Sequence, residues 1–153
     1  MSSSTSEVAS EGQPDEILNL TIPPDCDTEE EKVFEDFCKL YRYSRELYEW
    51  VDRGIGKIKI LKHKTTGIYR IVMRQNQTYI VRLNHQIPYI GNVLPKKNGT
   101  REYIWTAYDF ANGKLVRELF AVRFGLPETA NSFKSAFEQG RDANKVIYEK
   151  KKK

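Results

Sequence analysis

Apolar and polar residues alternate along most of residues 37 to 124, and a period of two is the pattern of strands with one buried face. The pattern predicts seven strands, which we place at 37–43, 54–61, 67–73, 78–83, 86–93, 103–110 and 115–124. The pairs Asn98-Gly99 and Asn112-Gly113 are typical of tight hairpin turns, because such turns need positive φ. Seven short strands joined in this way predict a mostly β sandwich or barrel.

A helix is expected to follow the strands. Beyond Pro127 the apolar residues Ala130, Phe133 and Phe137 recur at the three- and four-residue spacing of one helical face. We expect this C-terminal helix to close an open side or end of the sandwich. A second, short helix is predicted over 28–36, because Thr28 precedes three glutamates that the positive end of a helix dipole favours.

Composition divides the chain into three parts. Residues 1–28 are rich in Ser, Glu, Asp and Pro and poor in aromatic residues, so we expect an acidic arm that is disordered when alone. We place the folded domain at 29–148 and a basic tail at 149–153. Cys26 and Cys38 are too few for a disulfide framework, and we expect both to be reduced structural thiols.

The sequence offers no apolar run as long as a membrane span. Its first residues are polar and acidic, where a secretory signal needs a basic start followed by an apolar stretch. We therefore expect no membrane association, no secretion, and a cytoplasmic or nuclear location.

Charge is distributed very unevenly. Residues 1–36 carry 11 acidic side chains against one lysine, whereas residues 37–153 carry 24 basic and 10 acidic side chains. From Arg53 to Arg101 there are 11 lysines and arginines and no acidic residue. Like charges repel, so such a run indicates an anionic partner, for example nucleic acid, anionic lipid or an acidic peptide. The alternative is an ordinary solvated face of a basic protein.

Strand parity predicts where these basic side chains point. Lys57 and Lys59 share one face of their strand, and Arg70 and Arg74 share the face opposite Ile71. Arg82 lies opposite its apolar neighbours in the same way. If the three segments are consecutive antiparallel strands, all five charges line up across one sheet surface.

Catalytic chemistry finds little support in the sequence. His63 and His85 are the only histidines, and His63 lies in a basic run without a neighbouring acid to orient it. The usual phosphate-loop, dinucleotide, zinc and serine-hydrolase motifs are missing, so we expect a binding module with no enzymatic activity, cofactor or metal. Single-stranded nucleic acid stays open as a partner, although most aromatic residues occupy positions typical of a core.

Several motifs, in order along the chain, resemble the Ran-binding domains of small Ran-binding proteins and of a large nucleoporin. The most specific match is 49–56 (EWVDRGIG), which is similar to the family pattern E-W-[KV]-[ED]-R-G-x-G, and the next segment, 57–64 (KIKILKHK), is similar to D-V-K-L-L-K-H-K. Shorter matches are 39–43 (KLYRY) to K-L-F-R-F, 72–74 (VMR) to L-M-R, 84–85 (NH) to N-H, 109–111 (DFA) to D-F-A and 120–124 (FAVRF) to L-A-I-R-F.

The resemblance implies a pleckstrin-homology-like fold, a seven-stranded sandwich capped by a C-terminal helix. It implies binding to the GTP-bound form of the small GTPase Ran, whose released C-terminal segment wraps the domain and ends in an acidic stretch. The domain would act as a cofactor for Ran's separate GTPase-activating protein and help to strip transport receptors from Ran. Nucleocytoplasmic transport, and a place at the nuclear pore, follow from the same resemblance. We expect a monomer when free.

The candidate Ran-binding residues fall into two groups. Basic side chains on the predicted sheet surface are expected to hold the acidic segment, with arginine favoured where two parallel hydrogen bonds form. Trp50 is expected to lie partly in the core and partly at a pocket for an apolar residue of Ran, while an internal pair with Asp52 or Glu49 competes for Arg53. Gly54 and Gly56 are expected to permit a bulge. The full set is Trp50, Arg53, Lys57, Lys59, Arg70, Arg74 and Arg82. A lipid- or peptide-binding adaptor is the alternative.

Overall fold

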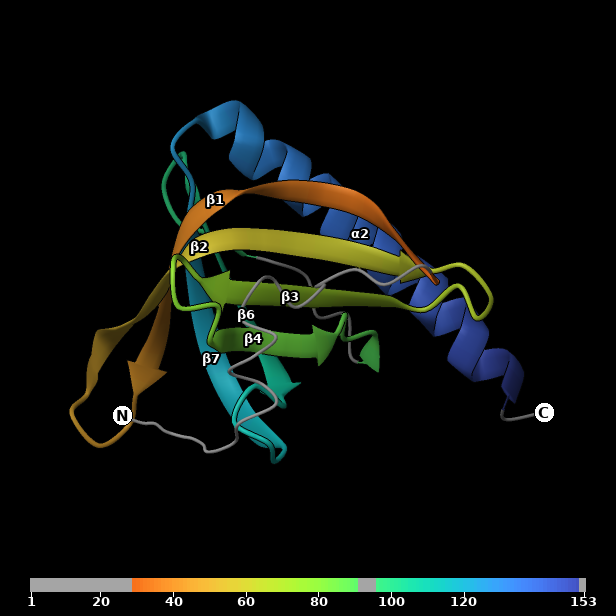
Figure 1. Cartoon of the computed structure of the whole chain (residues 1–153), viewed down its shortest axis with the longest axis horizontal. Helices are drawn as coiled ribbons and strands as arrows, with labels where there is room; N and C mark the ends of the chain where they lie inside the picture. Colours follow the sequence, from red (N-terminus) through yellow and green to blue (C-terminus); the bar gives the residue numbers. More distant parts are fainter. Residues whose placement is uncertain (1–28, 91–95, 152–153) are drawn as a thin grey trace.

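The computed structural model describes residues 29–90 and 96–151 and folds them into one antiparallel sheet and one helix (Figure 1). The sheet order is β4-β3-β2-β1-β7-β6-β5. This arrangement confirms the expected strand-rich fold with a C-terminal helix. The elements are β1 (Glu30–Ser44), β2 (Glu49–His63), β3 (Tyr69–Gln75), β4 (Val81–Gln86), β5 (Lys96–Lys97), β6 (Glu102–Asp109), β7 (Val116–Arg123) and α2 (Pro127–Lys151).

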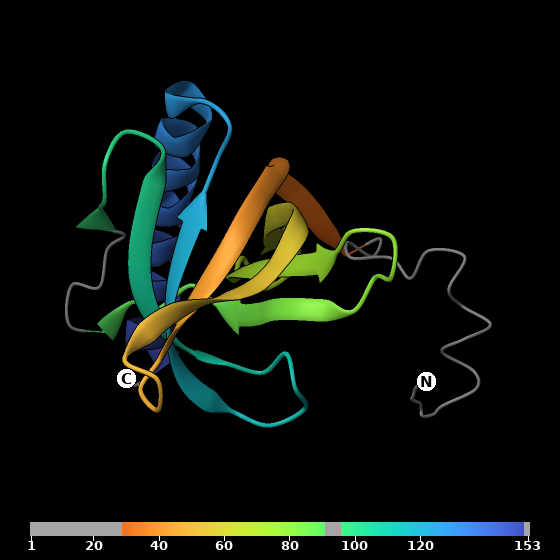
Figure 2. The ribbon, with the colours of Figure 1, turned by 90° about the vertical axis from the view of Figure 1, so that its left-hand side faces the viewer.

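The long strand β1 joins the two halves of the sheet. It pairs with β2 along nearly its whole length, and its Lys39–Arg42 stretch also pairs with β7. In Figure 1, β1 to β4 run across the view, and β7 and β6 cross behind them. Figure 2 shows the two halves of the sheet from the side. The sheet therefore wraps around its own apolar face instead of staying flat.

Helix α2 fills the open side of this folded sheet. Phe133 and Phe137 are fully buried, and their rings lie 5.6 and 5.8 Å from the ring of Trp105. Phe124 lies 5.2 Å from Phe133, so aromatic residues of strand and helix share one cluster. The helix continues through Lys151, so the first three residues of the expected basic tail are helical.

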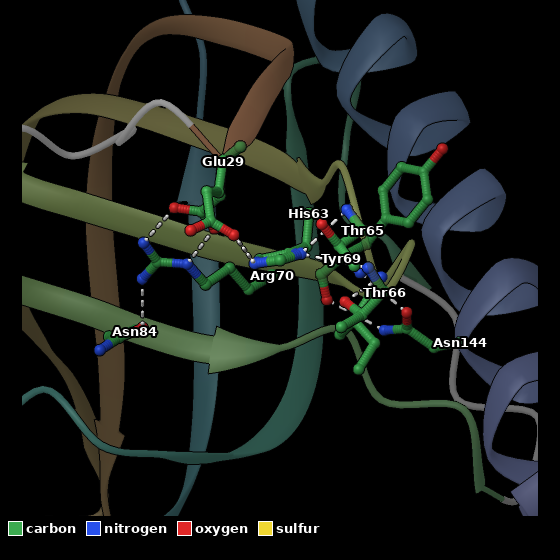
Figure 3. Close-up of polar contacts among 10 residues, drawn as sticks. Glu29, His63, Thr65, Thr66, Tyr69, Arg70, Asn84 and Asn144 are labelled. Carbon is green, nitrogen blue, oxygen red and sulfur yellow. Dashed lines mark hydrogen bonds and ion pairs between the residues drawn. The ribbon is translucent and has the colours of Figure 1, made fainter.

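Asn144 fixes the far end of the helix. Its amide accepts a hydrogen bond from the backbone N–H of Tyr69 and donates to the carbonyl oxygens of Tyr69 and Ile87, at 2.8 to 3.0 Å. The side chain is completely buried. Figure 3 shows Asn144 on the helix beside the labelled Tyr69. It satisfies the backbone N–H of Tyr69, where β3 begins, and the carbonyl oxygen of Ile87, just after β4. The Tyr69 carbonyl also accepts a hydrogen bond from the Ile87 N–H at 3.1 Å.

The predicted helix at 28–36 is wrong over the described part of that range, which is strand. β1 begins at Glu30, and a register shift between Lys32 and Phe34 turns the Phe34 ring inward. That ring makes edge contacts with Phe124 and Phe133 at 5.8 and 5.7 Å. Burial of this aromatic side chain and pairing with β2 outweigh the weak local preference for a helix.

The predicted strand at 86–93 is also wrong in its described part. β4 ends at Gln86, and 87–90 contain no strand, while 91–95 lie outside the described residues. The preceding strand starts at Val81 because Gln77 and Tyr79 adopt positive φ in the turn before it. The fifth strand is instead the short β5, which pairs with Tyr103 and Ile104 of β6.

Both Asn-Gly pairs lie in hairpin connections and their glycines have positive φ as predicted, 82° at Gly99 and 85° at Gly113. The connections span 98–101 and 110–115, so they are longer than the tight turns expected. The expected arm, residues 1–28, lies outside the described residues, and so does Cys26. Cys38 is a free, buried thiol, as predicted. No helix among 29–90 and 96–151 is long and apolar enough to cross a membrane.

Candidate functional site

Four basic side chains gather on the outer face of β2 and β3. Lys57 is paired directly with Arg74, Lys59 with Val72, and Leu61 with Arg70. The intervening Ile58, Ile60 and Ile71 point into the core and are fully buried. The parity prediction is therefore correct for these two strands. We call Lys57, Lys59, Arg70 and Arg74 the basic face.

Arg70 is tied down by neighbouring side chains. Its Nε and Nη2 bond the two carboxylate oxygens of Glu30 at 2.7 and 2.8 Å, and its Nη1 donates to Asn84 at 3.1 Å. Figure 3 shows the guanidinium between β1 and β4. A bidentate salt bridge is stronger than a single hydrogen bond. Arg70 therefore holds the start of β1 against the sheet.

Lys59 and Arg74 of the basic face also contact neighbouring groups. Lys59 lies 3.5 Å from the carboxylate of Glu35, and Arg74 donates to the carbonyl oxygen of Tyr79 at 2.9 Å. The hydrogen bond from Lys32, helped by Lys59 and Lys57, lowers the pKa of Glu35 below its usual range.

Lys57 is exposed and has no ion pair among the described residues; its Nζ lies 5.3 Å from the centroid of the Phe37 ring. It is therefore the member of the basic face best placed to meet a carboxylate from outside.

Arg82 is displaced from the line that strand parity predicts. The β3–β4 register shifts between Met73 and Arg74, which leaves Arg82 unmatched between Val81 and Leu83. Its Cγ passes close to Gly54, where an added Cβ would come within 2.9 Å. This irregularity places Arg82 near Gly54 of β2. Arg82 therefore does not lie in one row with the four side chains of the basic face.

Arg53 binds the backbone, and neither predicted acid is its partner. Its Nε donates to the carbonyl oxygen of Arg82 at 2.9 Å, and its Nη2 reaches the side chain of Asn112 at 3.5 Å. Burial lowers the pKa of this guanidinium, although Asp109 opposes the change. In the described structure Arg53 connects β2, β4 and the β6–β7 turn instead of pairing with Asp52 or Glu49.

Trp50 lies outside the buried core, contrary to the part-core expectation. It is 39% exposed near the end of the β1–β2 hairpin, and its ring meets Tyr43 edge-on at 5.5 Å. Leu47 and Tyr48 at the hairpin tip are still more exposed. The tryptophan of the core is Trp105. Trp50 is thus available to an apolar group of a partner.

A bulge lies beside Gly54, as predicted, whereas Gly56 allows close packing of two strands. Leu40 pairs with Gly54 and Tyr41 with Asp52, so Arg53 is the extra residue of a bulge. A Cβ at Gly56 would collide with the backbone carbonyl of Arg74. The glycine therefore allows β2 and β3 to approach each other closely.

The acidic partners of the basic face are not predicted by the sequence pattern. The local pattern predicts a short helix for Glu30 and Glu35, although they lie on β1 opposite β2. No simple alternation marks this segment as a strand, because Phe34 directly follows the apolar Val33. The two acids contact Arg70 and Lys59, so part of the charge of the basic face is balanced within the domain.

The two histidines form hydrogen bonds within the domain. His63 Nδ1 accepts from the backbone N–H groups of Thr65 and Thr66, and its Nε2 lies 3.6 Å from Glu29 (Figure 3). His85 is buried and accepts a hydrogen bond from the Trp105 indole at 3.2 Å. Within residues 29–90 and 96–151, no group of three or more His, Cys, Asp or Glu could hold a metal ion.

Comparison with known proteins agrees with this fold. Residues 25–143 match the model of the RanBP1 domain, so the chain belongs to the RanBP1 domain family, which is a family of binding modules. It is 40% identical over 111 residues to human E3 SUMO-protein ligase RanBP2, covering 72% of this chain and 3% of that protein. It is 36% identical over 118 residues to Ran-binding protein 1 homolog c of Arabidopsis thaliana, covering 77% and 54%. The chain thus spans a small fraction of the first of these relatives and about half of the second.

Solved structures share the fold. A Ran-binding domain of Nup2 from Ashbya gossypii superposes with a TM-score of 0.62 at 23% identity, covering 75% of this chain and 97% of that one. The Dm DCP1 EVH1 domain, solved in complex with the XRN1 DBM peptide, gives a TM-score of 0.51 at 13% identity, covering 94% of this chain and 98% of that one. The pleckstrin-homology-like architecture is therefore confirmed.

Proposed function

We propose that this protein binds the GTP-bound form of Ran and holds Ran's acidic C-terminal segment on the basic face. The observation that carries the proposal is the direct pairing of Lys57 with Arg74 across β2 and β3 in a chain of the RanBP1 domain family. Two adjacent cations of this kind, one of them without an ion pair in the described structure, attract carboxylates and speed their encounter.

Trp50 gives the same partner an apolar contact at the β1–β2 hairpin. Half-exposed aromatic rings are common at protein interfaces because they bury a large area while losing little conformational entropy. The Tyr43 ring holds Trp50 from one side. Arg53 and Arg82 support this region through the β2 bulge instead of forming a row with the basic face.

The protein acts as a non-catalytic cofactor. It assists a separate GTPase-activating protein and helps to release transport receptors from Ran, in the cytoplasm or nucleus and at the nuclear pore. The two histidines and Cys38 are buried or engaged in structural contacts, which supports a binding role. The purified protein alone should leave the GTP hydrolysis rate of Ran unchanged and should raise it when the activating protein is present.

Binding to Ran loaded with a non-hydrolysable GTP analogue, compared with Ran-GDP, tests the proposal. We expect tight binding that favours the GTP form and weakens as salt rises, since exposed charges are screened. The double variant Lys57→Glu/Arg74→Glu should weaken binding at least about tenfold, or about 1.4 kcal/mol. Arg70 is a poor choice for charge reversal, because a glutamate at 70 would face the buried Glu30.

The matched control is Lys145→Glu/Lys150→Glu, which changes the net charge equally on α2. This control should bind like the natural protein. Equal affinity for both nucleotide states would contradict Ran-GTP binding. In that case vesicles containing an anionic phospholipid and a single-stranded oligonucleotide would distinguish the lipid and nucleic-acid alternatives.

A further inference from the structure

An apolar groove lies at the edge of the folded sheet and adjoins the basic face at Arg70. It has a volume of about 740 Å³ and runs between the end of β4 with the residues after it and the β6–β7 hairpin. Large apolar side chains line it and are widely exposed: Ile90, Tyr108, Phe110 and Leu115 are 50 to 70% accessible. A patch of this kind on a small domain indicates that something covers it.

The charged residues that line the groove indicate which kind of segment could bind there. Arg70 and Arg117 are the charged residues among the described lining, and no described lining residue is acidic. Arg70 is already paired with Glu30, whereas Arg117 is exposed and has no ion pair within the described residues. The groove therefore suits a segment that combines carboxylates with alternating apolar side chains.

The chain itself contains such a segment before β1. Asp15 and Glu16 are followed by Ile17 and Leu18, and the alternation continues with Leu20 and Ile22. Val8 and Ala9 form the only other apolar pair between Ser2 and Pro24, so 15–22 is the most apolar run of the arm.

The connection to β1 places this segment within reach. Glu30 is bonded to Arg70, and Arg70 belongs to the groove lining, so the chain enters the described structure beside one end of the groove. The stretch from Ile22 to Glu29 spans at most about 25 Å. A short tether raises the local concentration of a docking segment to about the millimolar range, so even weak contacts are occupied.

We propose that residues 15–22 of the same chain dock in this groove. Leu18, Leu20 and Ile22 would cover the apolar lining, with Ile22 toward Arg70. Asp15 and Glu16 would then lie at the far end, where Arg117 offers an unpaired cation. The proposal is independent of Ran binding, because both the groove and the segment belong to one chain.

A spin label on the full-length protein tests this docking without any partner. The label is attached to Asn19→Cys in a Cys26→Ser background, since position 19 alternates with the apolar residues and Cys38 is buried. We expect the amide signals of Tyr108, Phe110 and Leu115 to lose most of their intensity and to recover when the nitroxide is reduced. Signals of Lys134 and Glu138 on α2 should keep theirs.

Two variants of the labelled protein make the result specific. Leu115→Glu should abolish the signal loss, whereas Val146→Glu, which alters a similarly exposed apolar residue of α2, should leave it unchanged. Intact groove signals in the labelled chain would overturn the proposal. So would signal loss spread evenly over the surface, or loss seen when spin-labelled and isotope-labelled chains are mixed, which would mean that a second copy occupies the groove.

Discussion

The side-chain amide of Asn144 on α2 bonds both the N–H and the carbonyl oxygen of Tyr69, which begins β3. The same amide also donates to Ile87, so one buried residue supplies three hydrogen bonds between the helix and the sheet. Phe133 and Phe137 hold the helix by apolar contact, whereas Asn144 fixes its position along the sheet.

Replacing Asn144 by alanine should lower the free energy of unfolding by about 3 kcal/mol, because buried backbone groups lose their partners. Urea denaturation measures the change. Asn131→Ala is the matched control, since Asn131 is exposed and makes one long contact, at 3.3 Å, with the Tyr103 hydroxyl. Equal losses for the two variants would show that the Asn144 hydrogen bonds contribute nothing special.

Gly56→Ala should destabilise the protein by about 2 kcal/mol or more, because the new methyl group meets the Arg74 carbonyl and forces β2 and β3 apart. Gly125→Ala, with open space around the added Cβ, should change stability little. Thermal melting followed by circular dichroism compares the two. A Gly56→Ala protein as stable as the natural one would mean that the strands separate at no cost.

Stability should fall as the pH drops below about 6.5, the ordinary pKa of histidine. Burial lowers the pKa of His85 in the folded protein, although the Gln86 carbonyl and Asp109 oppose this effect. The unfolded chain therefore binds a proton at a higher pH than the folded chain, and protonation favours unfolding until the folded-state pKa is passed.

Unfolding curves between pH 8 and pH 5 should show this loss, and Trp105 fluorescence should report it, since its indole donates to His85. His85→Gln removes the titrating group while keeping an acceptor. Its stability should vary less over the same range, and an identical pH dependence in both proteins would rule out His85 as the cause.

Cys38 should react with thiol reagents only through unfolding. Burial raises the pKa of its thiol well above the usual range, and the Sγ atom lies 3.9 Å from the Met73 sulfur. Because the thiolate is the reactive form, the folded protein offers almost none. In the Cys26→Ser variant, labelling should be slow in buffer and rapid in urea. Rapid labelling in buffer would contradict the burial of Cys38.

Alternation along the chain was sufficient to predict a β domain closed by a C-terminal helix, and the parity of Lys57, Lys59, Arg70 and Arg74 predicted a shared face. These features depend on residue spacing, which has a fixed relation to the direction of a side chain in a strand or helix. The motif around Trp50 and Gly56 likewise predicted the family, because its residue types and order are specific.

Only the tertiary structure decided where the strands begin and which groups the charged side chains contact. Glu29 and Glu30 favour a helix locally. Burial of Phe34 and the salt bridge between Glu30 and Arg70 nevertheless make this segment a strand. A one-residue bulge moved Arg82 out of line, and Trp50 lies outside the core that Trp105 occupies. Pairing register and burial depend on residues far apart in the sequence, so local preference could not reveal them.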